Sequence, residues 1–160
     1  MNPYLGVTLN ILATTLDAAS GPGLPVHIAL RAVLQRKSIA EAKAYLSRHN
    51  ILKGGAASCI TVCDAQDYLC AELTPAGVEF VNPMKSQTTV VHTNHLLGER
   101  ASTIENLTKD PTVSSTVSRY DKAKELIENG HGAIDATYVM KILRDKTEAL
   151  NRQVCRALLP

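Results

Sequence analysis

Two short apolar runs joined by a polar turn limit most strongly what this chain can fold into. Residues 58–63 and 68–73 are rich in the β-branched and apolar residues that favour strands. Residues 64–67 between them contain two aspartates, which suit a turn. The Pro-Ala-Gly sequence at residues 75–77 predicts a second turn, into a further strand at residues 78–81. The sequence therefore predicts antiparallel hairpins.

A strand and two helices are expected before these hairpins. Residues 5–13 form an apolar run that predicts a strand. Pro25 suits the first turn of one helix, and Ser38 with Glu41 gives the capping-box pattern at the start of a second. The residues expected to face the core are Val7, Leu9 and Ile11 on the strand, then Val26, Leu30, Val33 and Leu34, and finally Ile39, Ala42, Tyr45 and Leu46.

Two more helices are expected after the hairpins. Residues 98–111 show no clear period and predict a loop or a short irregular helix. A helix begins at Ser115 or Ser118 and stops at Gly130, and Asp135 caps the last helix. Their expected inward residues are Tyr120, Ala123 and Ile127, then Val139, Ile142 and Leu143. Because strands and helices fall in separate groups, the predicted fold class is α+β.

Composition and charge indicate one soluble domain, residues 1–160. Hydrophobic residues make up 45% of the chain and the mean hydropathy is −0.03, which argues against disorder. No apolar run approaches the roughly 20 residues of a membrane-spanning helix. The net charge is +2, the basic residues are dispersed and aromatic residues are scarce, so nucleic acid is not an expected partner. We expect a cytoplasmic protein with no membrane contact.

The four cysteines predict neither a disulfide framework nor a metal centre. Cys59, Cys63 and Cys70 lack a Cys-x-x-Cys pair, and the chain is neither short nor visibly secretory. Cys155, flanked by apolar residues, suits a small core position. No glycine-rich phosphate loop follows a strand, so no cofactor is expected.

The richest candidate site is the segment Val90–Leu97. The β-branched residues around Val91 predict a strand over residues 88–93, and side chains alternate across a strand. His92 and Asn94 should therefore share one face. An asparagine at a strand end presents an amide NH₂ that can donate to developing negative charge, and a turn-forming role is the alternative.

His92 and His95 have the spacing of a His-x-x-His metal pair. A helix would bring the two rings together, whereas a strand places them on opposite faces. The β-branched neighbours favour the strand, so we expect both histidines to line a pocket or support the fold rather than bind a metal.

The order of several segments resembles one enzyme family. The sequence from His92 to His95, followed by two leucines, is similar to a signature of the penicillin-type acyltransferases, which are N-terminal-nucleophile hydrolases. This family comprises acyl-CoA:6-aminopenicillanic acid and isopenicillin N acyltransferases. Other segments resemble it in the same order: residues 1–10, 23–31, 38–42 and 71–75, and the pair 143–145 and 154–156.

The resemblance implies a fold and partners. The expected architecture is the four-layer αββα sandwich of N-terminal-nucleophile hydrolases, of which this chain supplies a central and incomplete portion. Unpaired sheet edges and exposed apolar faces would then need a complementary subunit or a second copy to cover them.

The resemblance also implies a reaction and a site. The expected activity is that of a cysteine acyltransferase or amidohydrolase acting on amide or thioester acyl groups, with acyl-CoA as a possible substrate. Asn94 would donate to the tetrahedral oxyanion. Asn2, His92, His95 and Arg156 are the expected substrate-binding residues, although an arginine like Arg156, and Arg144 likewise, is also common as a solvated helix-end charge.

Members of the family create a cysteine nucleophile at a new N-terminus by cutting their own chain. The resemblance places that cysteine upstream of Met1, so we expect the chain to be inactive alone. Lys146 and Ala157 replace histidines that the family usually has, which indicates a divergent substrate or lost activity. Two alternatives stay open: a non-catalytic relic that binds a partner or forms oligomers, and a self-contained hydrolase that pairs His92 or His95 with an internal cysteine.

Overall fold

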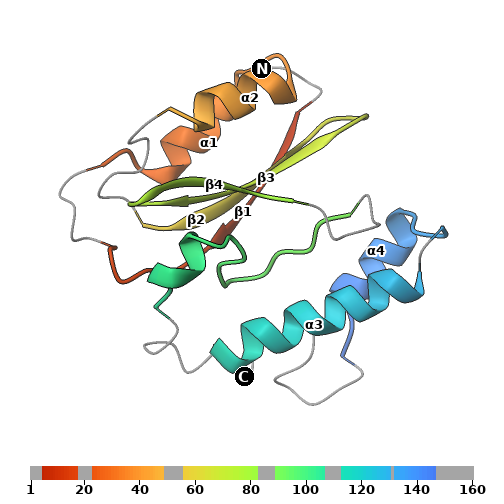
Figure 1. Cartoon of the computed structure of the whole chain (residues 1–160). Coiled ribbons are helices and arrows are strands. Elements are labelled where there is room, and N and C mark those ends of the chain that lie inside the picture. The colour runs from red at the N-terminus through yellow and green to blue at the C-terminus, as the bar shows by residue number, and fades with distance from the viewer. Residues whose placement is uncertain are drawn as a thin grey trace, which may run out of the picture. The chain divides into compact units, whose positions relative to one another are not determined.

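The computed structural model describes residues 5–17, 23–48, 56–82, 89–106, 113–130 and 132–146 (Figure 1). Its internal contacts divide the chain into two units, Met1–Leu107 and Thr108–Pro160. The structure defines each unit by itself, and the single-domain organisation stays a prediction. No helix in the described ranges is long and apolar enough to cross a membrane.

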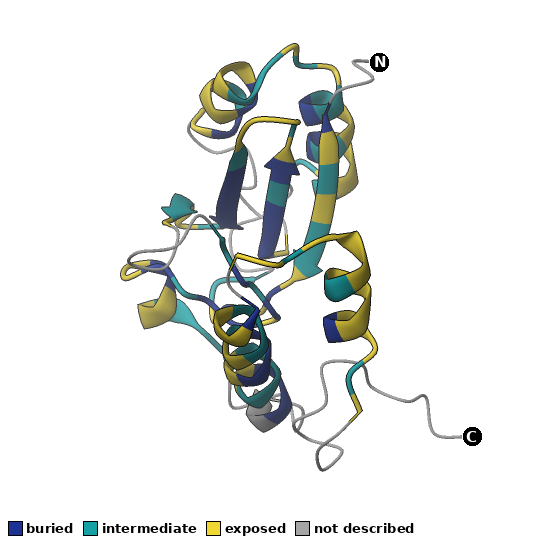
Figure 2. Cartoon of the chain, turned by 90° about the vertical axis from the view of Figure 1, so that its right-hand side faces the viewer, coloured by how far each residue is buried: buried dark blue, intermediate teal, exposed yellow. Residues whose placement is uncertain are grey.

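The first unit is built on a four-stranded antiparallel sheet with the order β1-β2-β3-β4 (Figure 1). The strands are β1 (Gly6–Ile11), β2 (Ser58–Cys63), β3 (Tyr68–Thr74) and β4 (Gly77–Val81). Each strand pairs with the next one along the chain, which confirms the predicted hairpins. The buried residues of the sheet all lie on the inner strands β2 and β3, whereas the residues of the edge strands β1 and β4 are intermediate or exposed (Figure 2).

Short polar contacts close the two hairpins. Asp64 Oδ1 accepts the backbone N–H groups of Gln66 and Asp67, each at 2.8 Å, and so forms the β2–β3 turn. At the β3–β4 turn, Thr74 Oγ1 accepts the Ala76 N–H at 3.2 Å. Both turns lie where the sequence predicts them.

Two helices cover one face of the sheet (Figure 1): α1 (Val26–Leu34) and α2 (Ile39–Leu46). The predicted cap of α2 is confirmed, because Ser38 Oγ accepts the Glu41 N–H at 3.2 Å. Glu41 Oε2 in turn accepts the N–H of Lys37 at 2.9 Å. The core on this side consists of Leu5, Ala29, Val33, Ala42, Leu46, Ile60, Val62, Leu69, Ala71 and Leu73.

The opposite face of the sheet is covered by the segment from residue 89 to 106, which includes the 3₁₀ turn η1 (Ala101–Ile104). Its smaller core consists of Leu12, Ala57, Cys59, Cys70, Leu96 and Ala101. The prediction that Ile11 shares the buried face of Val7 and Leu9 is wrong. Val7 and Leu9 pack against the first core, but Ile11 is 68% exposed because it ends the edge strand.

The second unit is a pair of helices, α3 (Val113–Asn129) and α4 (Ala136–Leu143). As predicted, Gly130 follows the first helix, and Asp135 caps the second by accepting the Tyr138 N–H at 2.7 Å. Tyr138 also donates its hydroxyl to the Leu126 carbonyl at 2.7 Å, which ties the helices together. Ile142 is buried as expected, whereas Val139 and Leu143 are exposed in the described structure, contrary to the prediction. The observed fold class is α+β, as expected.

Candidate functional site

The segment that carries the candidate site is not a strand. Residues 89–97 contain no regular secondary structure, so the predicted strand at 88–93 is wrong over its described part. β-branched residues favour a strand only where a neighbouring strand can pair with them, and here the segment crosses one face of the four-stranded sheet. His92 and Asn94 therefore do not share a strand face. His92 turns toward the sheet and Asn94 is exposed.

Asn94 is anchored to the end of the first strand. Its side-chain Nδ2 donates to the Ile11 carbonyl oxygen at 3.0 Å. Val91, Thr93 and His95 on either side of it are buried. The amide group therefore sits at the exposed tip of a segment whose neighbours are fixed in the core.

Glu72 on β3 is the buried centre of the site. The residue is 0% exposed, and its carboxylate accepts three hydrogen bonds. Oε1 accepts from His92 Nε2 at 2.8 Å and from the Leu97 N–H at 2.7 Å. Oε2 accepts from the Gly98 N–H at 2.9 Å. A buried carboxylate is costly unless it is paired and hydrogen-bonded, and these partners meet that requirement.

Both ring nitrogens of His92 face acceptors. Nδ1 lies 2.7 Å from the Thr93 carbonyl oxygen, which can only accept, and Nε2 faces the Glu72 carboxylate. This arrangement favours hydrogen on both nitrogens, and therefore the imidazolium form of His92 paired with Glu72. Burial alone lowers the pKa of His92, but the Glu72 hydrogen bond and charge, with Cys70 nearby, raise it above the ordinary 6.5.

Two more glutamates hold the same segment. Glu79 on β4 lies opposite Glu72 in the strand register. Its Oε2 accepts the Ala101 N–H at 2.9 Å and its Oε1 accepts the Arg100 N–H at 3.4 Å. Glu105 Oε1 accepts the Leu96 N–H at 2.5 Å, and burial raises the pKa of Glu105. We call Glu72, Glu79 and Glu105 the glutamate clamp, because together they fix the backbone of residues 96–101.

Gly98 is required by the close approach of Glu79. A Cβ at position 98 would lie 2.5 Å from both Cδ and Oε2 of Glu79. Glu79 could swing away only by giving up its bonds to Arg100 and Ala101. Glycine at this position therefore lets two carboxylates reach the same stretch of backbone.

His95 occupies a different environment from His92. It is 8% exposed, and its Nδ1 lies 3.1 Å from Thr93 Oγ1. Within the described ranges, no three His, Cys, Asp or Glu side chains gather as ligands of a metal ion would.

Two thiols lie beneath the segment. Cys59 and Cys70 Sγ atoms are 3.5 Å apart, and both residues are buried, whereas Cys63 is exposed. The two thiols share a hydrogen bond, which raises the pKa of Cys59 and lowers that of Cys70 to about 7. Burial opposes the Cys70 shift, while a second hydrogen bond from Thr61 Oγ1 and the charge of His92 support it.

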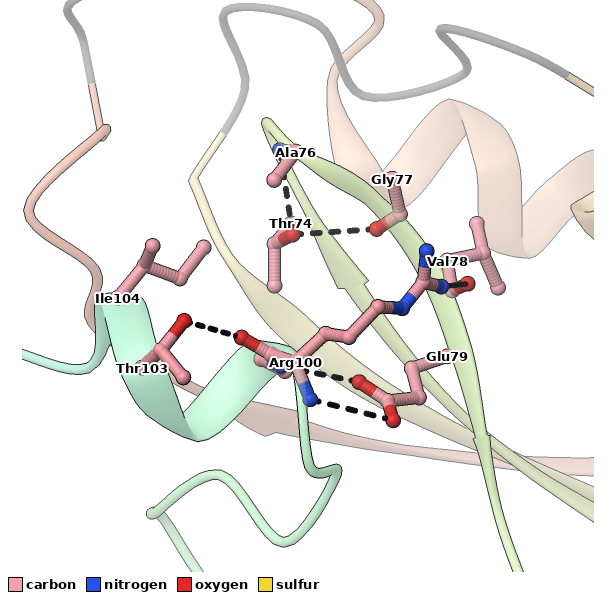
Figure 3. A pocket seen from close by; sticks show the side chains of 9 residues that line it. Thr74, Ala76, Gly77, Val78, Glu79, Arg100, Thr103 and Ile104 are labelled. Carbon is pink, nitrogen blue, oxygen red and sulfur yellow. Dashed lines mark hydrogen bonds between the residues drawn. The ribbon is translucent and has the colours of Figure 1, made fainter.

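A hollow of about 230 Å³ lies between the β3–β4 turn and η1 (Figure 3). Thr74, Val78, Glu79, Arg100 and Thr103 are among the residues that line it. The Arg100 side chain extends across it and donates to the Val78 carbonyl at 3.4 Å. Sequence reasoning did not select this hollow, because residues 98–111 show no periodic pattern.

The structure brings together three of the five predicted site residues. His92, Asn94 and His95 lie in one segment, while Asn2 and Arg156 lie outside the described residues, as does Cys155. The roles expected for all five site residues stay predictions. Sequence reasoning assigned no role to the glutamate clamp. A signal was present at Glu72, since a charged residue within the apolar run 69–73 needs a partner when the strand is buried.

Comparison with known proteins agrees with the resemblance seen in the sequence. None of the curated proteins compared with the chain matches it. Residues 2–158 match the sequence model of the family described as acyl-coenzyme A:6-aminopenicillanic acid acyl-transferase. The match covers nearly the whole chain and includes the segment held by the glutamate clamp. The chain therefore belongs to the acyl-coenzyme A:6-aminopenicillanic acid acyl-transferase family.

Proposed function

We propose that this chain is the part of an N-terminal-nucleophile cysteine acyltransferase or amidohydrolase that supplies Asn94 to stabilise the oxyanion. The substrate is a small molecule with an amide or thioester acyl group, acyl-CoA included. The sheet, covered on one face by α1 and α2, is one of the two sheets of an αββα sandwich. The observation that carries the proposal is the exposed Asn94 amide, held at the Ile11 carbonyl in a segment that the glutamate clamp fixes.

In this reaction a cysteine thiolate attacks the acyl carbonyl carbon, and a free α-amine accepts the thiol proton. The carbonyl electron pair moves to oxygen, and the Asn94 Nδ2–H donates to that oxyanion. The amine or thiol leaving group departs with a proton and leaves a thioester. A second amine or water then attacks the thioester and releases the cysteine.

The nucleophile is a different cysteine from Cys59, Cys63 and Cys70. All three lie within β2 or β3, so each α-nitrogen is part of a peptide bond. Cys59 and Cys70 are also buried, which keeps substrate away from their thiols. We propose that Asn2 and Arg156 contact the substrate and that the buried rings of His92 and His95 shape the site beneath Asn94.

Replacement of Asn94 tests the assignment. In the enzyme that contains the nucleophile-bearing segment, Asn94→Ala should lower kcat by roughly 100-fold or more and change KM little, because the lost bond forms mainly in the transition state. Asn94→Asp should be at least as damaging, since it adds negative charge beside the oxyanion. His95→Ala should cost less. A folded Asn94→Ala enzyme with an unchanged melting temperature and unchanged kcat would rule out the oxyanion role.

The 160-residue chain by itself provides a second test. We expect no turnover of acyl-amide or acyl-CoA substrates, because no cysteine of this sequence has a free α-amine without a cut directly before it. Clear turnover would contradict the proposal. Turnover that disappears with one Cys→Ser replacement would identify a self-contained thiol enzyme instead.

A further inference from the structure

We propose that Glu72 and His92 are positioning residues that fix the Asn94 amide by closing the backbone on both sides of it. The inference rests on the proposed function, and it names the element of the fold that sets the geometry of that amide.

The Glu72 carboxylate forms hydrogen bonds with both ends of the turn that carries Asn94. Glu72 Oε1 bonds to the His92 ring before Asn94 and to the Leu97 N–H after it. Glu72 Oε2 bonds to the Gly98 N–H. Residues 92–98 therefore form a closed turn with the buried ion pair at its base and the exposed Asn94 at its tip.

The tip is attached to the same sheet at a second point. Asn94 Nδ2 bonds to the Ile11 carbonyl on β1, and Glu72 lies on β3. The intervening strand β2 pairs with both, through Ile11 with Ser58 and Ser58 with Leu73. The Asn94 amide is thus held between two strands whose separation the sheet fixes, as a preorganised donor requires.

The protonation of His92 couples this arrangement to pH. Loss of one ring proton would leave a lone pair facing either the Glu72 carboxylate or the Thr93 carbonyl oxygen, so the base of the turn would lose one of these two bonds. The other titratable groups that act on His92 are Cys70 on β3 and Glu105 after η1. Glu72 is in direct contact with the His92 ring, and the side chains of His92 and Glu72 are 4% and 0% exposed, respectively.

Glu79 supplies a matched control. Its carboxylate also accepts two backbone N–H groups of the clamped segment, but from Arg100 and Ala101, beyond the closed turn. Glu72→Gln and Glu79→Gln make the same chemical change on neighbouring strands at paired positions. A general loss of stability would follow from both variants, whereas a change at Asn94 should follow from Glu72→Gln alone.

The experiment is an NMR pH titration of the full chain, labelled with ¹⁵N, in the wild type and in both variants. In the wild type, the Asn94 side-chain NH₂ signals should shift with the same midpoint as the His92 ring. In Glu72→Gln the His92 midpoint should fall and the Asn94 signals should stop following it. In Glu79→Gln both should behave as in the wild type.

Two results would overturn the proposal: Asn94 signals in the wild type with no inflection at the His92 midpoint, or equal changes in the two variants. The wild-type titration decides the matter even where Glu72→Gln fails to fold. In the active enzyme, Glu72→Gln should lower kcat by roughly tenfold with little change in KM. If Asn94→Ala leaves kcat unchanged, the proposed function fails, while the NMR titration still decides whether Glu72 positions Asn94.

Discussion

Glu72 and Glu79 lie directly opposite each other on adjacent strands, and both carboxylates accept backbone N–H groups of one segment. Like charges at such a cross-strand pair are ordinarily destabilising. Here Glu72 accepts the N–H groups of Leu97 and Gly98, and Glu79 accepts those of Arg100 and Ala101. The four N–H dipoles offset the repulsion between the two carboxylates, so β3, β4 and the segment that bonds to both stabilise one another.

Replacement of Glu79 by glutamine should lower the free energy of unfolding by about 1 kcal/mol. Glutamine keeps one acceptor oxygen but turns an NH₂ donor toward a backbone N–H that is itself a donor. Urea denaturation of the two proteins measures the difference. Glu99→Gln, the same change at an exposed position of the segment, is the control and should have little effect. Unchanged or increased stability of Glu79→Gln would show that relief of charge repulsion outweighs the lost bonds.

The ion pair predicts how stability depends on pH. The pKa of His92 is raised on folding, so its contribution is fully present below pH 6.5 and is lost as the pH rises through the raised value. The pKa of Cys70 is lowered from 9.0 to about 7, so between these values it adds stability as the pH rises and opposes the His92 effect.

Comparison of the Cys70→Ser variant with the double variant Cys70→Ser, Glu72→Gln isolates the contribution of His92, because neither protein has the Cys70 thiol. The difference in free energy of unfolding should be largest below pH 6.5 and should shrink as the pH rises. Urea denaturation across this range gives the measurement. A difference that stays constant, or that grows with pH, would contradict an imidazolium at position 92.

The three described cysteines should differ sharply in reactivity. Iodoacetamide should alkylate the exposed Cys63 in the native protein, whereas Cys59 and Cys70 should react only after unfolding. The low pKa of Cys70 favours its thiolate, but a residue that is 1% exposed gives the reagent no access. Peptide mass spectrometry over a time course distinguishes the sites. Native alkylation of Cys70 as fast as that of Cys63 would show that the second core opens readily.

The core beneath α1 and α2 gives a prediction on stability alone. Leu46 is 0% exposed, so Leu46→Ala should lower the free energy of unfolding by about 2–5 kcal/mol. Ile28, on the outer side of α1, is 54% exposed, and Ile28→Ala should change stability by less than about 0.5 kcal/mol. Thermal or urea unfolding of both variants provides the comparison. Similar losses in the two would mean that α1 buries its outer face against another surface.

The elements that the sequence predicts correctly are those set by local signals. Asp64 marks the first hairpin turn, and Ser38 and Asp135 mark two helix starts, because each side chain bonds to backbone within three residues. The resemblance to the family likewise came from short motifs in order. Such features depend only on neighbours in the chain, so one sequence suffices to find them.

The features that the sequence did not predict depend on distant partners. The run around Val91 has strand composition, yet it lies across one face of the four-stranded sheet, and Glu72, far away in the chain, accepts the N–H groups of Leu97 and Gly98 that follow the run. The exposure of Ile11 follows from its place at a sheet edge. Neither the pairing of β1 with β2 nor the path of residues 89–106 can be read from a periodic pattern.

The contact between Gly98 and the Glu79 side chain also constrains how this family can change its sequence. An alanine Cβ at position 98 would lie 2.5 Å from the end of the Glu79 side chain, so Glu79 would have to turn away and give up its bonds to Arg100 and Ala101. In contrast, shortening residue 79 beside a glycine creates no collision. The glycine is therefore easier to replace where position 79 is already short, and we expect chains that have lost the glycine to carry a shorter side chain opposite it.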